Sequence, residues 1–391
     1  MFKLLLITLV AIIHNSSACT EFIVEVKGNK GNVVGRTMEF AQNFPFNVIS
    51  QPSGEVYTGD VTPGCKGKTP LSWTGKYKSA YLASATRLIE DADKLWLDGQ
   101  NSAGLSVGAL YFDGYAQYPS ELVGDECTNG ISHIQMIKYI LSVYGSTNEV
   151  REALSNGTFP AVWGRELKVG FIRIGLTQNY IFPIHWSIVD NSGDAIVLEY
   201  TKDGRQVYEN QVGVFTNNPT YDWHTTNLNS YINIQRDSFE PKTWKRAGTE
   251  YTIKSFGHGS GFLGLPGDFT PPSRFIRTAA MVRFSGNAKN AQDAALKAWH
   301  IINSVDIPKH AVDDFTNWAV VKDLKNNVMY FRGVNYISIR QIDLNKTSNT
   351  EAEYVKLNGK FEDCVQDVTS QMKSYDANIK EELPAEPRDE L

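Results

Sequence analysis

Cys19 is the residue of this chain whose type and position point most directly to chemistry. Lys3 and the apolar run 4–13 are followed by Ser16-Ser17-Ala18, a pattern typical of a secretory signal peptide that is cut before residue 19. Removal of residues 1–18 would give Cys19 a free α-amine with a pKa near ~7.7–8.0, close to the ~8.5 of its thiol. The amine would then accept the thiol proton at neutral pH, which predicts a hydrolase with an N-terminal nucleophile.

Other roles for Cys19 have to be weighed against this prediction. A lipoprotein cysteine normally follows a bulky aliphatic residue three places earlier, but Ser16 stands there, and lipid attachment would also acylate the amine. In an exported chain Cys19 could instead be half of a disulfide, or a buried cysteine on a strand. The residues around Cys19 alone do not choose among these roles.

The composition is that of a globular protein that is able to bury a large core. The chain has 391 residues, of which 42% are hydrophobic and 12% aromatic, and a length of this size fits one domain or two. A net charge of -5 without a basic block excludes an electrostatic footprint for nucleic acid. No apolar run approaches the ~20 residues that span a bilayer, so we expect an exported protein without a membrane span.

Neither the cysteines nor the histidines are spaced as metal ligands. Cys65, Cys127 and Cys364 contain no C-x-x-C pair, and a disulfide between two of them would leave the third over. The same absence of spacing makes the histidines packing or loop residues: His185, His224 and His258. We therefore expect no metal and no cofactor.

Local patterns place two charged residues near Cys19. Residues 19–26 and 33–40 are strand-like and flank a turn at 28–32, so a hairpin would bring Arg36 and Glu39 beside Cys19. A second hairpin is predicted from strands 185–189 and 195–200 around a turn at 191–194.

Helical patterns lie between these strand regions. Residues 132–144 and 291–305 repeat apolar residues at helical spacing, and Ser146-Thr147-Asn148-Glu149 is a capping box. Residues 317–342 return to strand character, so blocks of strands and helices predict a layered α+β domain over 19–345. The polar, acidic segment 346–391 is expected to be a less compact tail.

Several longer segments carry a resemblance to a known family. Residues 35–40, 98–105, 216–224 and 264–275 occur in the order and spacing of the choloylglycine hydrolase family, which contains bile salt hydrolases and penicillin V acylases. The resemblance covers most of residues 19–345. It implies the four-layer αββα sandwich of Ntn-hydrolases and hydrolysis of a linear amide bond.

The same resemblance assigns the catalytic roles. These fall on Cys19, Arg36, Glu39, Tyr111, Asn217 and Arg274. Cys19 would be the nucleophile, Arg36 would hold its thiolate, and Glu39 stands where most of the family has an aspartate that contacts the α-amine. The Asn217 side chain and the Tyr111 backbone amide would bind the oxyanion, and Arg274 would complete the polar ring.

Each of these residues also has an ordinary structural interpretation. Arg36 and Glu39 could form a surface ion pair, Asn217 could belong to a turn, and Tyr111 could be core. Independent coincidence of all these positions in the same order is improbable, so their joint occurrence favours catalysis.

The implied partner is a small-molecule N-acyl amide. Glycine or taurine conjugates of bile acids are the leading substrates, with penicillin V or N-acyl homoserine lactones as alternatives. A secreted binding protein or lipoprotein on the same scaffold is the non-enzymatic alternative, and a homo-oligomer is compatible with the sequence.

We expect a periplasmic or secreted protein. In a eukaryote the location would be different. The final residues 388–391 resemble a retrieval signal of the K-D-E-L type and would indicate the endoplasmic reticulum lumen, and the glycosylation sequons at Asn156 and Asn345 would then matter.

Overall fold

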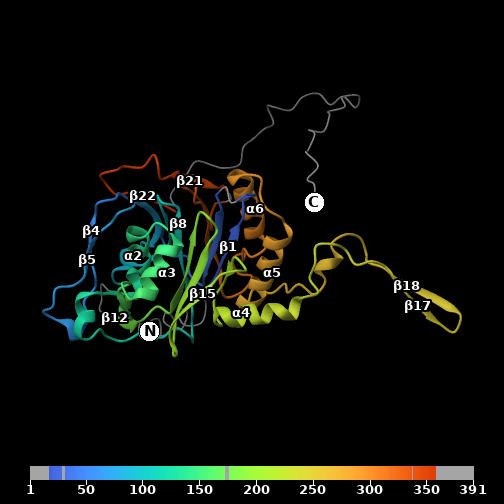
Figure 1. The fold of residues 1–391 in the computed structure, drawn as a ribbon, viewed down its shortest axis with the longest axis horizontal. Coiled ribbons are helices and arrows are strands. Elements are labelled where there is room, and N and C mark those ends of the chain that lie inside the picture. The colour runs from blue at the N-terminus through green and yellow to red at the C-terminus, as the bar shows by residue number, and fades with distance from the viewer. Residues whose placement is uncertain (1–16, 29–30, 172–175, 337, 358–391) are drawn as a thin grey trace, which may run out of the picture. The chain divides into compact units, whose positions relative to one another are not determined.

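The computed structural model describes residues 17–28, 31–171, 176–336 and 338–357, and two β-sheets organise them (Figure 1). The first sheet has the strand order β16-β1-β2-β19-β20-β21, made by Val214–Phe215, Ser17–Val24, Val33–Phe40, Phe315–Asp323, Val328–Gly333 and Arg340–Asp343. The second has the order β15-β14-β13-β8-β7-β6-β3-β22, made by Gly204–Glu209, Ala195–Thr201, Ile184–Asp190, Leu105–Tyr111, Trp96–Asn101, Ser79–Ser84, Phe46–Gln51 and Glu353–Lys356.

Helices cover the outer faces of the two sheets. On the first sheet, α5 (Pro271–Phe284) packs against β1 and β16, and α6 (Ala291–Asn303) packs against β2 and β19. On the second sheet, α2 (Met136–Val143) packs against β7 and β8, and α3 (Thr147–Asn156) contacts β13. Because β1 also contacts β8, the sheets face each other across the core and give the αββα layering that was expected.

Smaller elements decorate these layers. α4 (Tyr221–Leu228) contacts α5. Eight short strands form four pairs: β4 with β5, β9 with β10, β11 with β12, and β17 with β18. In chain order these strands span Val56–Thr58, Ser72–Thr74, Gly130–Ser132, Ala161–Trp163, Leu167–Phe171, Leu176–Tyr180, Lys242–Arg246 and Thr249–Ile253.

Both hairpins predicted from the sequence are confirmed. β1 and β2 are antiparallel with Cys19 opposite Met38 and Glu21 opposite Arg36, although residues 29–30 of the predicted turn lie outside the described residues. β13 and β14 form the second hairpin. The first of these pairings places Cys19 and Arg36 on neighbouring strands by local folding alone.

Three predicted helices are confirmed, including the one expected over 291–305, which is α6, and only the first of them begins later than expected. The helix expected from Ser132 begins as an α-helix only at Met136, because residues 133–135 form a short 3-10 helix that the Gln135 side chain closes on Ser132. α3 begins as predicted after Ser146, whose hydroxyl accepts a hydrogen bond from the Glu149 amide at 3.2 Å.

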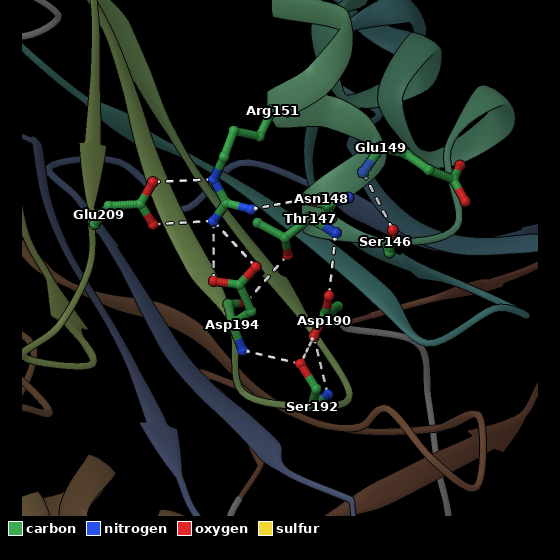
Figure 2. A network of polar contacts seen from close by, with 9 residues as sticks. All are labelled: Ser146, Thr147, Asn148, Glu149, Arg151, Asp190, Ser192, Asp194 and Glu209. Carbon is green, nitrogen blue, oxygen red and sulfur yellow. Dashed lines mark hydrogen bonds and ion pairs between the residues drawn. The ribbon is translucent and has the colours of Figure 1, made fainter.

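A surface network ties the start of α3 to the β13–β14 hairpin (Figure 2). Arg151 reaches Asp194 at 3.0 Å and Glu209 at 2.9 Å. Asp190 accepts a hydrogen bond from the Thr147 amide at 3.1 Å. The network thereby fixes the turn of the hairpin against the helix that covers it.

The sequence placed the end of the domain too early, at residue 345. The segment 346–391, which was expected to be a tail, contains β22, and this strand pairs with β3 at the edge of the second sheet. Leu357 is fully buried, and its amide donates to the Phe46 carbonyl at 2.9 Å. The polar composition hid a short edge strand whose Tyr354-Val355 pair carries the β propensity; residues 358–391 lie outside the described residues.

Cys65 and Cys127 form a disulfide with a Cα–Cα distance of 5.3 Å. Cys19 is buried and forms no disulfide with the other cysteines in the described ranges, and Cys364 lies outside those ranges. No helix within the described ranges is long and apolar enough to cross a membrane.

Candidate active site

Cys19 lies on β1 with its nitrogen and its sulfur both engaged. Its nitrogen donates a hydrogen bond to Asn217 Oδ1 at 2.6 Å, and Arg36 Nη2 lies 3.8 Å from its Sγ. Burial raises the pKa of the thiol above its ordinary value, while Arg36 and a hydrogen bond from the Tyr111 backbone oppose that rise. The thiol therefore needs a base to lose its proton, in spite of the arginine beside it.

Arg36 is fully buried between the two sheets. Its Nη1 donates to Asp98 at 2.9 Å, its Nη2 also donates to the Ala109 carbonyl, and its guanidinium lies 5.2 Å from the centroid of the Trp318 ring. The alternative of a surface ion pair with Glu39 is therefore wrong for Arg36. Asp98 belongs to a segment that supported the family resemblance, but nothing local in the sequence marked it as the partner of Arg36.

Asn217 and Arg274 hold the other side of Cys19. Asn217 follows β16, which pairs with β1, and Arg274 projects from the first turn of α5. Arg274 donates through Nη2 to Asn217 Oδ1 at 2.7 Å, and through Nη1 to the Cys19 carbonyl and to Thr20 Oγ1. Asn217 Oδ1 thus accepts hydrogen bonds from the Cys19 nitrogen and from Arg274.

Tyr111 ends β8 opposite Ile184 and serves the site in two ways. Its backbone amide is directed at the Cys19 sulfur, and its carbonyl accepts a hydrogen bond from Asn217 Nδ2 at 2.8 Å. Its hydroxyl contacts that of Tyr180 in the buried wall of the site. The side chain of Tyr111 thus belongs to the core, and its backbone makes the polar contacts of the site.

Glu39 lies on β2, where it pairs with Ala18 of β1. Its carboxylate accepts a hydrogen bond from Thr316 Oγ1 at 2.9 Å. Burial raises its pKa to about 7, although the charge of Arg274 opposes the rise. Its negative charge in turn raises the pKa of the Cys19 thiol, so Glu39 lies close enough to influence the Cys19 sulfur. The contact predicted between Glu39 and a free α-amine stays a prediction.

A small apolar cavity of about 70 Å³ opens beside Cys19. Aromatic and aliphatic side chains supply most of its wall, from β2, β3, β13 and the segments around them. The lining includes Met38, Phe40, Phe44, Phe46, Ile89, Leu95, Leu97, Tyr111, Phe182 and Ile184. An apolar cavity beside a thiol is suited to the hydrocarbon part of a small molecule.

The histidines behave as the sequence suggested, with an added structural role. His224 Nε2 hydrogen-bonds the Asn217 carbonyl at 2.9 Å and His185 Nε2 hydrogen-bonds the Thr216 carbonyl at 3.0 Å, so these two brace the backbone of the site. Burial lowers the pKa of His224 to about 4, which keeps it neutral. His258 is exposed. Within the described residues, no group of three or more His, Cys, Asp or Glu is arranged to hold a metal.

Comparison with known proteins agrees with this geometry. The sequence profile described as linear amide C–N hydrolases, choloylglycine hydrolase family, matches residues 19–365. The chain belongs to the choloylglycine hydrolase family. The match begins at the residue whose nitrogen and sulfur form the centre of the site.

Relatives and solved structures of this family cover nearly the whole chain. The bile salt hydrolase/transferase of Clostridium perfringens is 30% identical over 86% of this chain and 95% of its own. A mutant of the conjugated bile acid hydrolase from the same organism superposes with a TM-score of 0.72 at 26% identity, covering 90% of this chain and 99% of its own.

Penicillin V acylases are also similar. The enzyme of Pectobacterium atrosepticum is 26% identical over 85% of this chain and 82% of its own. The structure of the Agrobacterium tumefaciens enzyme shares the fold, with a TM-score of 0.65 at 20% identity over 86% of this chain and 90% of its own. The chain is thus a hydrolase of linear amide carbon–nitrogen bonds with the Ntn-hydrolase αββα fold, which confirms the predicted family and fold.

Proposed function

We propose that this family member is an exported amidohydrolase whose nucleophile is the thiol of Cys19 after removal of residues 1–18. One observation carries the proposal. The nitrogen of Cys19 hydrogen-bonds Asn217, its sulfur lies beside Arg36, and an apolar cavity opens next to it. Without the residues before it, that nitrogen would be the amine that accepts the thiol proton.

The acylation step follows from these positions. The α-amine takes the proton of the thiol, and the sulfur attacks the acyl carbonyl to form a carbon–sulfur bond. The developing oxyanion is stabilised by the second hydrogen of Asn217 Nδ2 and by the Tyr111 backbone amide. Collapse of the tetrahedral intermediate breaks the carbon–nitrogen bond, and the ammonium group of Cys19 gives its proton to the departing amine.

The deacylation step restores the enzyme. Water loses a proton to the α-amine, attacks the thioester carbonyl and displaces the Cys19 thiolate, which is then reprotonated. Arg36 holds negative charge on the sulfur as it attacks and as it leaves.

Replacement of Cys19 tests the nucleophile directly. Cys19→Ser is expected to abolish turnover, because a hydroxyl at neutral pH is a much weaker nucleophile than a thiol, and circular dichroism should show an unchanged fold. Substantial turnover by the purified variant would refute the mechanism. Intact mass of the wild-type protein is the companion measurement: an unmodified Cys19 at the terminus is expected, whereas a diacylglyceryl adduct would reject the free amine.

For the substrate, we propose glycine or taurine conjugates of bile acids as the leading class. Its support is the similarity to a bile salt hydrolase/transferase over most of both chains. Penicillin V or another N-acyl amide with a smaller acyl group is the second candidate. The cavity of about 70 Å³ favours it, because ligand pockets commonly hold ~300–1,000 Å³ and a steroid would require the aromatic wall to move.

A substrate panel separates the two classes. We expect kcat/KM to be highest for taurocholate or glycocholate, compared with penicillin V and N-acyl homoserine lactones, with Cys19→Ser as the blank. A preference of about tenfold or more for either of the latter two, which equals roughly 1.4 kcal/mol of transition-state discrimination, would overturn the bile acid assignment and leave the amidase chemistry intact.

Export is supported by the leader pattern in residues 1–18 and by the Cys65–Cys127 disulfide, since disulfides persist in oxidising compartments. We propose a periplasmic or secreted location, or the endoplasmic reticulum lumen in a eukaryotic cell. Fractionation of the source cells tests this: recovery of the full-length, leader-bearing chain from the cytosol would contradict it.

A further inference from the structure

A closed set of buried charges lies on the core side of Cys19. It consists of Arg36, Asp98, Lys322 and Glu21, each with an exposure of 0 or 1%. Asp98 accepts from Arg36 Nη1 at 2.9 Å and lies 2.8 Å from Lys322 Nζ through its other oxygen. Lys322 Nζ is also 3.5 Å from Glu21 Oε2. The sequence pattern singled out neither Lys322 nor Glu21.

The core is shaped around this cluster. Glu21, Arg36 and Lys322 come from β1, β2 and β19 of one sheet, and Asp98 comes from β7 of the other. Gly108 on β8 makes room between them, because a Cβ there would lie 2.4 Å from Glu21 Oε2 and 2.9 Å from Arg36 Nη1. A cluster that spans both sheets and excludes a methyl group is a specific arrangement rather than loose polar filling.

The order of the charges determines what Arg36 can do for the sulfur. Alone with Arg36, the Asp98 carboxylate would offset most of the positive charge that faces Cys19. Lys322 shares that carboxylate through both oxygens, and Glu21 in turn lies against Lys322. The formal charges of the cluster cancel, so a thiolate on Cys19 is one additional negative charge in a buried region, where charges interact more strongly than in water.

We propose that Lys322 and Glu21 are positioning residues that set, in opposite directions, how readily the Cys19 sulfur carries negative charge. Lys322 draws Asp98 away from Arg36 and favours the thiolate; Glu21 draws Lys322 away from Asp98 and adds a negative charge, and so disfavours it. The inference rests on the proposed role of Cys19 as nucleophile. The other charged or titratable groups that face Cys19 are Glu39 on β2, Tyr111 on β8 and Arg274 on α5.

The test is the pH dependence of Cys19 alkylation by iodoacetamide, read by mass spectrometry of the peptide that contains it. Lys322→Met is expected to raise the apparent pKa of the thiol, and Glu21→Gln is expected to lower it. A change of one pKa unit alters the thiolate fraction, and so the alkylation rate below that pKa, about tenfold. kcat below neutral pH should follow the same directions, with KM within about twofold.

The two signs separate electrostatic positioning from damage to the fold. A purely structural role would lower activity in both variants, so movement of the thiol pKa in the same direction in both, or in neither, would overturn the proposal. Lys322→Arg keeps the charge and should restore the wild-type profile. If Lys322→Met does not fold, Glu21→Gln still decides: a raised or unchanged thiol pKa in that variant refutes the inference.

Failure of the proposed function is distinguishable from failure of this inference. Turnover that survives in Cys19→Ser would reject the nucleophile, while the alkylation profiles would still report on the cluster. Opposite profiles with a Cys19-dependent turnover would support both.

Discussion

Two arginines in this protein are each held by acidic side chains, and they differ mainly in depth. Arg151 contacts Asp194 and Glu209 at the surface, with 29% of its side chain exposed (Figure 2). Arg36 contacts Asp98 with no exposure of either side chain. The contact distances of 2.9 to 3.0 Å are alike, so pairing geometry alone does not distinguish the two networks.

Depth determines what each pair contributes. Exposed ion pairs stabilise a fold by about 0–1 kcal/mol, because water screens the charges and competes for them. Loss of one partner from a buried pair costs about 3–5 kcal/mol, since the other charge is left without compensation. Arg36 also lies within 3.8 Å of the Cys19 sulfur, so its network connects folding to the proposed nucleophile, whereas that of Arg151 holds a helix against a hairpin.

The largest effect is expected from Arg36→Leu. It leaves Asp98 with Lys322 alone and removes the cation beside the sulfur, so the free energy of unfolding should fall by about 3–5 kcal/mol and turnover should be lost. Urea denaturation and kcat measure the two effects. Arg36→Lys is the control: it keeps the charge but loses the planar fork, so it should recover stability more than activity. If Arg36→Leu were as stable as the wild-type protein, the buried pair of Arg36 would contribute no more to stability than the exposed pair of Arg151, and the prediction would be contradicted.

Glu39 adds a pH-dependent case to the comparison. With Ala18 still attached to Cys19, burial raises the pKa of Glu39 from 4.5 to about 7, so the folded state disfavours its ionised form. The resulting destabilisation is absent below pH 4.5 and complete above pH 7, where it reaches on the order of 3 kcal/mol. Glu39→Gln should therefore gain stability relative to wild type as the pH rises through this window.

Urea denaturation at pH 4.5, 6 and 8 checks the sign for Glu39. The trimmed protein is the matched comparison, because an ammonium group on Cys19 would favour the Glu39 carboxylate and reduce the difference. A difference between wild type and Glu39→Gln that is independent of pH in the untrimmed chain would contradict the prediction.

Gly108→Ala tests the space around the buried network without removing a charge. The added methyl group would overlap Glu21 and Arg36, so we expect a loss of about 1–3 kcal/mol in unfolding free energy and a slower Cys19 alkylation. Gly114→Ala is not a matched control because its φ of 76° strains any side chain. Gly267→Ala is suitable, since nothing lies near its Cβ position and no positive φ is involved. Equal stability of both alanine variants would contradict the close packing.

The smallest effect is expected from Arg151→Leu. Loss of its contacts with Asp194 and Glu209 should cost no more than about 1 kcal/mol, with kcat and KM unchanged. A high-salt series sharpens the comparison: salt should narrow the stability gap between wild type and Arg151→Leu and leave the gap for Arg36→Leu nearly intact. A loss for Arg151→Leu as large as that for Arg36→Leu would show that depth is not the deciding factor.

The sequence predicted what local folding determines. The β1–β2 hairpin put Arg36 near Cys19 because both lie within one pair of adjacent strands, and segments of the family pattern located Asn217 and Arg274. Lys322 and Glu21 could not be found this way, because β19, which carries Lys322, lies far from β1 and β2 in the sequence and joins their sheet only in the folded protein. A signal did exist: Glu21 is the one charged residue of β1, and Lys322 directly follows the buried apolar run 319–321 of β19.

The end of the domain was missed for a related reason. β22 has four residues, of which the first and the last are charged, so it resembles a solvated segment until β3 supplies its partner. Its contribution lies in cross-strand pairing, which composition does not record. The six residues predicted for the site do converge on one place in the fold.

β1 begins at Ser17, two residues before Cys19, and this constrains when residues 1–18 could be removed. Ala18 and Cys19 are 7% and 3% exposed and pair with Glu39 and Met38, so the peptide bond between them is part of the folded sheet. A peptidase needs an extended, accessible segment of chain, so in the folded protein the start of β1 would first have to separate from β2. If residues 1–18 are removed, removal has to precede folding, and a chain that folds first would be a kinetically trapped, inactive precursor.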